Sequence, residues 1–153
     1  MIETRLKELG IELPLPSAPA ANYAPFVKVG TLVYISGQLP MRDGALKYGG
    51  KVGRDFILEE GQDAAKICAY NILTQLKAAC EGDLNRVQRC IRLGGFVNCL
   101  EDFKDQPKVV NGASDIMVSL FGERGRHARA AVGVNSLPLG AAVEIEALFE
   151  VLK

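Results

Sequence analysis

Two spacings of hydrophobic residues alternate along the chain, and each predicts a different kind of element. Three segments carry apolar residues every three or four positions, the spacing of a helix that buries one side, and they span residues 2–9, 58–80 and 105–122. Four segments rich in valine, isoleucine and leucine are typical of strands, and they span residues 26–38, 87–99, 127–135 and 143–151. Glycines within 41–57 predict a loop with a short hairpin.

The order of these elements predicts one α+β domain. After the first short helix, four prolines favour an extended segment: Pro14, Pro16, Pro19 and Pro25. Strand, helix, strand, helix, strand and strand then follow, which predicts a mixed sheet with both long helices on one face. Two helices cover one face only, so we expect the other, partly apolar face to be buried by self-association.

Arg129 is a strong charge within a predicted strand of alanine, valine and glycine. Because side chains alternate across a strand, Arg129 shares a side with Ala131 and Gly133, and Val132 lies on the other. If the aliphatic sides of the last two strands meet a common core, Arg129 and Glu144 both point away from it. A guanidinium keeps its charge, so Arg129 either pairs with a glutamate of the last strand or binds a small carboxylate with two donors.

Composition narrows the classes of function. Eighteen basic and eighteen acidic residues balance, so charge gives no case for nucleic acid or an anionic membrane as partner. No apolar run approaches the length of a membrane span and the N-terminus does not resemble a signal peptide, so we expect a cytoplasmic protein. The four cysteines form no CxxC pair and His127 is the only histidine, which argues against a Cys/His metal site. Cys68 and Cys80 fall within a predicted helix, where we expect buried thiols.

Several motifs in a fixed order resemble the RidA family, also called the YjgF/YER057c/UK114 family. They are SGQLP at residues 36–40, ARAAV at 128–132 and VEIEA at 143–147, with further matches between Phe96 and Asn111. The resemblance covers roughly residues 18–152. It divides the chain into an N-terminal extension with a short helix, residues 1–17, and a RidA-like domain, residues 18–153.

The resemblance implies a chorismate-mutase-like fold, assembled as a homotrimer with active sites in clefts between subunits. RidA-type members hydrolyse reactive enamine and imine intermediates, such as 2-aminoacrylate and its imine, to a 2-oxo acid and ammonia, without a cofactor. By resemblance, Arg129 clamps the substrate carboxylate and Glu144 positions or activates the attacking water. The implied substrate-binding residues are Ser36, Gly37, Asn111, Phe26, Tyr23 and Ala131.

Two of these positions depart from the family pattern. Phe26 stands where the family usually has a tyrosine, although Tyr23 could supply a hydroxyl, and Ala131 stands where a cysteine is frequent. The departures favour an alternative function, a trimer that binds a small 2-oxo acid or related carboxylate without turnover. The leading prediction is an imine deaminase that acts on 2-imino acids.

A third function, the endoribonuclease activity attached to some family members, has less support. Arg124, Arg126 and Arg129 lie close together in the sequence. The neutral charge balance, the single histidine and the lack of an aromatic stacking platform argue against RNA as a partner.

Overall fold

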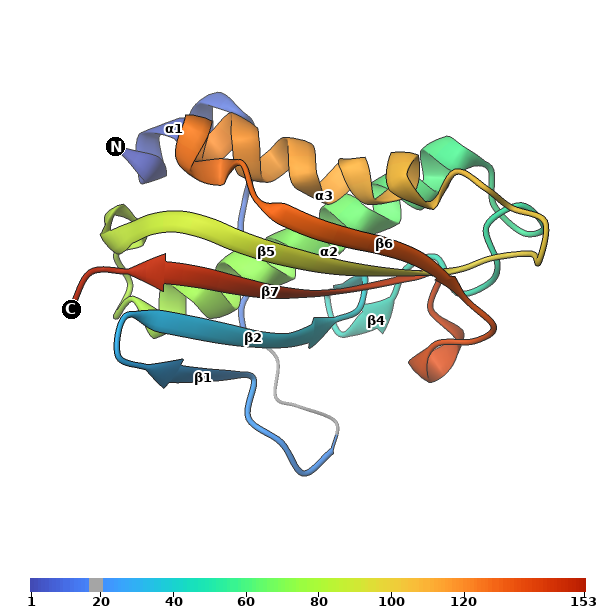
Figure 1. The fold of residues 1–153 in the computed structure, drawn as a ribbon, viewed down its shortest axis with the longest axis horizontal. Helices are drawn as coiled ribbons and strands as arrows, with labels where there is room; N and C mark the ends of the chain where they lie inside the picture. Colours follow the sequence, from blue (N-terminus) through green and yellow to red (C-terminus); the bar gives the residue numbers. More distant parts are fainter. Residues whose placement is uncertain (17–20) are drawn as a thin grey trace.

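In the computed structural model, which describes residues 1–16 and 21–153, a five-stranded sheet carries both long helices on one face (Figure 1). The strands of this sheet are β1 (Phe26–Val29), β2 (Leu32–Gln38), β5 (Val87–Asn98), β6 (Ala128–Val134) and β7 (Val143–Val151). Their order is β1-β2-β7-β5-β6, with β5 and β6 parallel and the other neighbours antiparallel. The predicted α+β fold with a mixed sheet is therefore confirmed.

Three helices complete the fold: α1 (Ile2–Glu8), α2 (Leu58–Ala79) and α3 (Gln106–Phe121). At the start of α2, the Glu60 carboxylate accepts a hydrogen bond from the Ile57 N–H at 3.1 Å. α2 and α3 approach so closely that a Cβ atom at Gly112 would lie 2.3 Å from the Gln62 carbonyl oxygen. Only glycine permits this approach, and the two helices form one layer on the sheet.

Short elements lie between these parts: the predicted hairpin of β3 (Met41–Arg42) and β4 (Ala45–Leu46), and the 3-10 turns η1 (Leu84–Arg86), η2 (Gly122–Gly125) and η3 (Pro138–Gly140). α1 contacts α3 and buries Ile2 and Leu6 in the common core. Of the predicted extended segment, residues 11–16 have no helix or strand, and Pro19 lies outside the described residues.

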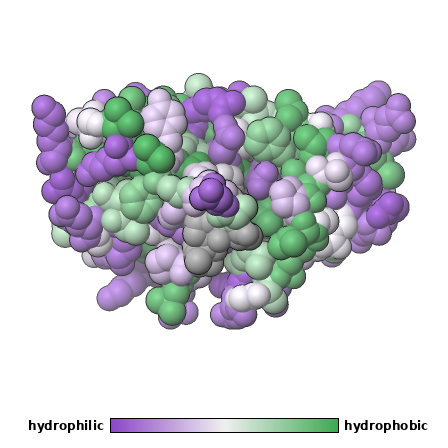
Figure 2. Space-filling view, turned by 90° about the horizontal axis from the view of Figure 1, so that it is seen from below, coloured by the Kyte–Doolittle hydropathy of each residue, from purple (hydrophilic) through white to green (hydrophobic). Residues whose placement is uncertain are grey.

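The core lies between the sheet and the α2–α3 layer. On this side β5 and β7 contribute Leu93, Val97, Ile145 and Phe149, which are all fully buried. No described helix covers the opposite side of the sheet, which we call the open face, and Val132 there keeps 45% of its surface exposed. Figure 2 views the molecule from the β1 edge and shows apolar and hydrophilic surface side by side. The prediction that the helices cover one face only is confirmed.

The first predicted strand is in fact two. The segment 26–38 was expected to run as one strand, but Gly30 takes a φ of +60° and the chain turns back between β1 and β2. Phe26 then pairs with Ile35 in an antiparallel hairpin. The glycine is the physical reason, since this left-handed backbone conformation is easily adopted only without a side chain.

The buried side of β6 is the opposite of the one predicted. Arg129 is the register partner of Leu93, a fully buried residue, and a Cβ atom at Gly133 would lie 2.8 Å from the Gln106 amide of α3. Arg129 therefore lies on the helix side of the sheet and Val132 on the open face. β6 is an edge strand with small residues on both sides, so counting aliphatic residues could not identify its buried side.

Candidate active site

Arg129 is held against α3 by three hydrogen bonds to uncharged acceptors. Its Nη1 donates to Asn111 Oδ1 at 2.8 Å and to Ser114 Oγ at 3.1 Å, and its Nη2 donates to the Pro107 carbonyl oxygen at 3.3 Å. Asn111 and Ser114 are three residues apart on α3 and so lie on the same side of the helix. The structure thus brings together Arg129 and Asn111, two of the residues that the sequence predicted for the site.

Two of the five N–H groups of Arg129 have no partner among the described residues. Nη1 uses both of its hydrogens and Nη2 uses one, which leaves Nε–H and one Nη2–H. Arg129 Nε has no hydrogen-bond partner in the described part of the chain and is not buried, so it is accessible to solvent. Nε and Nη2 form one edge of the planar guanidinium, and two parallel donors on one edge match the two oxygens of a carboxylate.

The charge of Arg129 is not neutralised by a carboxylate within residues 1–16 and 21–153. Pairing with a glutamate of β7 was one of the two sequence interpretations. Of those glutamates, Glu146 pairs instead with Arg92, on the open face, at 3.1 Å. The described chain therefore leaves Arg129 with a full positive charge and a free donor edge.

Ser114 connects Arg129 to the only histidine of the chain. Ser114 Oγ lies 2.8 Å from His127 Nε2, and His127 Nδ1 lies 2.7 Å from the Gly125 carbonyl oxygen. Burial, with a smaller contribution from the Arg129 charge, lowers the pKa of His127 below its usual 6.5, against the opposing effect of the hydrogen bond to Gly125. His127 is therefore neutral at pH 7. We call Arg129, Asn111, Ser114 and His127 the arginine group.

Glu144 lies on β7 at the open face, beside a glycine of β2. A Cβ atom at Gly37 would lie 2.9 Å from Glu144 Cδ and 3.0 Å from its Oε2, so the carboxyl group occupies the space that a side chain at position 37 would take. Ser36 precedes this glycine, and its hydroxyl donates a hydrogen bond to the Ala24 carbonyl oxygen at 2.7 Å. We call Ser36, Gly37 and Glu144 the glutamate group.

The Glu144 carboxyl group is half-buried and titrates above its usual range. Burial raises its pKa above 4.5, and the nearby Glu146 raises it further. No described residue donates a hydrogen bond that would stabilise its charge. A carboxylate with a raised pKa and free oxygens can accept a proton from water.

The arginine and glutamate groups of one chain lie on opposite sides of the sheet. β5 separates β6 from β7, and in its register Arg129 pairs with Leu93, whereas Glu144 pairs with Phe96, three residues further on and on the other face. The prediction that Arg129 and Glu144 share one side of the sheet is therefore wrong. Within one chain, a small molecule bound at the guanidinium does not reach the carboxylate.

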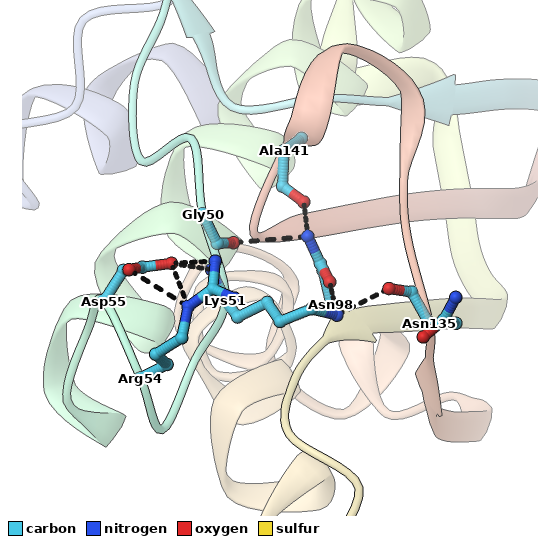
Figure 3. A network of polar contacts seen from close by, with 7 residues as sticks. All are labelled: Gly50, Lys51, Arg54, Asp55, Asn98, Asn135 and Ala141. Atoms are coloured by element: carbon cyan, nitrogen blue, oxygen red, sulfur yellow. Dashed lines mark hydrogen bonds and ion pairs between the residues drawn. The ribbon is translucent and has the colours of Figure 1, made fainter.

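A polar network fixes the loops from which β7 begins (Figure 3). Buried Asn98 accepts a hydrogen bond from Lys51 Nζ at 2.8 Å and donates to the carbonyl oxygens of Gly50 and Ala141 at 3.3 and 3.1 Å. Lys51 Nζ also donates to the Asn135 carbonyl oxygen. The network joins the loop before α2 to the connection between β6 and β7. It therefore fixes the start of the strand that carries the glutamate group.

The other predicted binding residues lie outside these two groups. Ala131 follows Arg129 by two positions on the helix side and packs against the core. Phe26 also packs against the core, next to Ile35. Tyr23 lies in the loop before β1 with half of its surface exposed.

The three arginines near β6 do not share a partner. Arg124 donates to the Val87 carbonyl oxygen at 3.1 Å, and Arg126 pairs with Glu123 at 3.1 Å. Their guanidinium groups are engaged separately from that of Arg129, so their closeness in sequence does not produce one anion-binding cluster.

All four cysteines are free and buried, which confirms the prediction made for Cys68 and Cys80. Within the part of the chain that the structure describes, no three His, Cys, Asp or Glu side chains gather as possible metal ligands. None of the described helices is both long and apolar enough to span a lipid bilayer.

Ser114 and His127 were not predicted as site residues. A signal was present, because Ser114 stands one helical turn after Asn111, and His127 stands two residues before Arg129 and so on the same side of an extended chain. The sequence could not show that α3 packs against β6, and this contact is what brings Ser114 next to His127.

The chain is similar to a known protein family over nearly its whole length. The family model described as "YjgF/chorismate mutase-like, putative endoribonuclease" matches residues 3–151. Protein TCP17 of Trypanosoma cruzi is 48% identical over 150 residues, which cover 97% of this chain and 93% of that protein. The 2-iminobutanoate/2-iminopropanoate deaminase of Dermatophagoides farinae is 31% identical over 140 residues, which cover 90% and 92%.

A solved structure shows the same fold over nearly the whole chain. The crystal structure of Atu1372 from Agrobacterium tumefaciens, a protein of unknown function, superposes with a TM-score of 0.92 at 52% identity. The match covers 98% of this chain and 92% of that one.

Proposed function

Because the chain belongs to the YjgF/chorismate-mutase-like family, which includes RidA-type proteins, we propose that it hydrolyses reactive 2-imino acids and their enamine forms to 2-oxo acids and ammonia. A relative at 31% identity carries the name of this activity. The substrates of such a reaction carry a carboxylate next to the reacting carbon, so the site needs a cationic group that binds it. Because water is the nucleophile, the site also needs a base that takes a proton from it.

The free donor edge of Arg129 is the observation that carries this proposal. The guanidinium has three neutral acceptors, no described carboxylate partner and two unpaired N–H groups on one edge. A bidentate pair with the substrate carboxylate satisfies both the charge and the donors. Asn111 and Pro107 bind Nη1 and Nη2 from α3 and so restrain the orientation of the guanidinium.

Glu144 supplies the base. It accepts a proton from water while the water oxygen bonds to the imine carbon, and the electron pair of the C=N bond moves to nitrogen, which takes up a proton. The hydroxyl proton of this intermediate is then transferred to the amine nitrogen through Glu144. The C–N bond breaks, ammonia leaves and the C=O bond of the 2-oxo acid forms. A pKa raised above 4.5 makes Glu144 a stronger base than an exposed carboxylate, which suits it to accepting and returning the proton.

The two groups form one site only if two protomers contribute. Arg129 and Glu144 lie on opposite sides of the sheet within a chain, so we propose that Arg129 of one protomer faces Glu144 of its neighbour. The uncovered, partly apolar open face supports association, and a homotrimer is the assembly that the family resemblance implies.

An assay with 2-imino acids generated in situ tests the activity. The wild type should release 2-oxo acid faster than the uncatalysed background. Arg129→Ala should lower kcat/KM at least about 30-fold, the effect of losing about 2 kcal/mol of charged hydrogen bonding. Arg126→Ala, which removes the same charge from an exposed residue paired with Glu123, is the matched control and should stay near the wild-type rate.

A binding protein without turnover is the alternative that this assay separates. It predicts that a small 2-oxo acid binds to the wild type and not to Arg129→Ala, while the release of 2-oxo acid stays at background. If neither turnover nor binding depends on Arg129, the proposed function fails.

A further inference from the structure

We propose that Ser114 and His127 are positioning residues for Arg129, and that they hold its guanidinium with the Nε–Nη2 edge turned toward the substrate carboxylate. The inference rests on the proposed function, since it takes Arg129 as the carboxylate-binding group. It concerns two residues that act through Arg129 and have no contact with substrate themselves.

The hydrogen bonds of this cluster have one consistent direction. The Gly125 carbonyl oxygen can only accept, so His127 Nδ1 carries a hydrogen and donates it. In a neutral imidazole Nε2 then accepts, and the Ser114 hydroxyl donates to it. With its hydrogen committed to His127, Ser114 Oγ offers its lone pairs to Arg129 Nη1. Each group therefore has a single role, and the orientation of Arg129 depends on the tautomer of His127.

The far end of this chain of bonds is attached to rigid backbone. Gly125 is buried in η2, and a Cβ atom there would lie 2.1 Å from the Met117 carbonyl oxygen of α3. η2 therefore packs directly against the helix that also carries Ser114, and only glycine fits at this contact. The acceptor for His127 and the hydroxyl beneath Arg129 are thus fixed relative to each other.

The burial of both residues supports a positioning role. Ser114 is only 9% exposed, and both ring nitrogens of the half-buried His127 are engaged in hydrogen bonds, so neither residue has a free polar group for a substrate. A positive charge on His127 would lie beside Arg129 and would convert Nε2 from an acceptor to a donor. The lowered pKa of His127 keeps it neutral and preserves its role as an acceptor.

The bond to Ser114 restrains a side chain that is otherwise free to rotate. Nη1 has two hydrogens, one bound by Asn111 and one by Ser114, so removing the hydroxyl leaves this end of the guanidinium with one acceptor. The charge of Arg129 remains, but its free edge is no longer held in one direction. We therefore expect weaker binding of the carboxylate with little change in the chemical step.

Four variants and one control test this inference on the full-length protein. Ser114→Ala should weaken binding of 2-oxobutanoate, a probe with the product's carboxylate, about tenfold and raise KM by a similar factor, while kcat changes less than about twofold. Ser114→Thr keeps a hydroxyl and should restore most of the affinity. His127→Gln keeps an acceptor and should be milder than His127→Phe. Ser119→Ala removes an exposed hydroxyl from the same helix and should behave as wild type.

The outcomes separate this inference from the proposed function. If Arg129→Ala abolishes binding while Ser114→Ala only lowers thermal stability, the positioning role is overturned and the proposed function stands. If the wild type neither binds nor hydrolyses these acids, the proposed function fails, and nitrogen-15 NMR of the free protein decides the positioning role. The positioning role is supported if His127 is protonated on Nδ1 and if the Nη signals show that the Arg129 guanidinium rotates slowly in the wild type and faster in Ser114→Ala. A His127 protonated on Nε2, or unchanged Arg129 signals, would overturn it.

Discussion

Gly37 and Glu144 share one space on the open face of the sheet. A Cβ atom at Gly37 would lie 2.9 Å from Glu144 Cδ and 3.1 Å from its Cγ, closer than such atoms normally approach. The carboxyl group is the flexible end of a side chain, so an added methyl group would move it rather than the strands. The missing side chain at position 37 therefore determines where the carboxylate lies.

Gly37→Ala should separate activity from stability. The methyl group displaces the Glu144 carboxylate, so we expect kcat/KM to fall about tenfold or more, because misplacing a reacting group by an ångström is costly. The free energy of unfolding should change by less than about 1 kcal/mol. Steady-state kinetics and urea denaturation measure the two effects.

Gly94→Ala is the matched control for this variant. Its Cβ atom would lie 2.8 Å from Arg92 Nη1 and 2.9 Å from Glu146 Cγ on the same face, so it meets the Arg92–Glu146 ion pair and not the Glu144 side chain. It should retain most of the activity. Equal losses in Gly37→Ala and Gly94→Ala would mean that the open face, not the position of Glu144, controls the rate.

Glu144→Gln should make the protein more stable and less active. The pKa of Glu144 is 4.5 in the unfolded chain and higher in the folded chain. Between these two pKa values the folded chain binds more protons than the unfolded one, so stability is lost as pH rises from the lower to the higher value. Glutamine removes that cost, so we expect the free energy of unfolding at pH 7 to rise. Activity should fall about 100-fold with loss of the base.

Glu150→Gln controls for the loss of a negative charge, because Glu150 lies on the same strand and side as Glu144. Its unfolding free energy and rate should stay near wild type. A Glu144→Gln variant that is less stable at pH 7, or as active as wild type, would contradict the assigned environment and role.

His127 should make the protein sensitive to mild acid. The pKa of His127 is 6.5 in the unfolded chain and lower in the folded chain. Between these two pKa values the unfolded chain binds more protons than the folded one. The contribution of His127 to stability is complete above about pH 6.5 and is lost as pH falls through the folded pKa. Because it is the only histidine, its ring signals in an NMR titration are unambiguous, and their midpoint should lie below 6.5.

Denaturation at several pH values provides the second measurement for His127. Between pH 7 and pH 5 the wild type should lose more stability than His127→Gln. A titration midpoint at or above 6.5 would contradict the buried, neutral state of this residue.

Gly112→Ala should destabilise the fold. The added Cβ atom meets the Gln62 carbonyl oxygen at 2.3 Å, and backbone cannot move aside as a side chain can. We expect a loss of about 1–3 kcal/mol, typical of overpacking between helices. Thermal unfolding measures it, and a wild-type melting temperature would show that α2 and α3 are not in such close contact.

The sequence predicted the elements well because each long element has a clear period. α2 and α3 bury one side, and β7 alternates buried aliphatic residues with glutamates, as its spacing predicted. The two long helices on one face followed from the order of elements. The turn at Gly30 was missed because apolar residues continue on both sides of it.

The site was predicted only in part, because its assembly depends on contacts that sequence patterns do not record. Arg129 and Glu144 were predicted from their charge within strand patterns and Asn111 from the family resemblance, and the structure joins Arg129 to Asn111 at 2.8 Å. The predicted buried side of β6 was wrong because alanine and glycine fit either face of an edge strand. Ser114 and His127 were missed because a parallel pairing of β5 with β6 is what places α3 above Arg129.

A mixed-subunit experiment tests most directly whether Arg129 of one protomer and Glu144 of another form one hydrolytic site. Arg129→Ala and Glu144→Gln chains, each with its own tag, are co-expressed, and assemblies that carry both tags are isolated and assayed with a 2-imino acid. Each variant alone should be inactive. If the site lies between protomers, every trimer that carries both tags has both residues intact in one of its three sites, and activity should recover to about one third of wild type. No recovery in mixed assemblies that form normally would contradict the account.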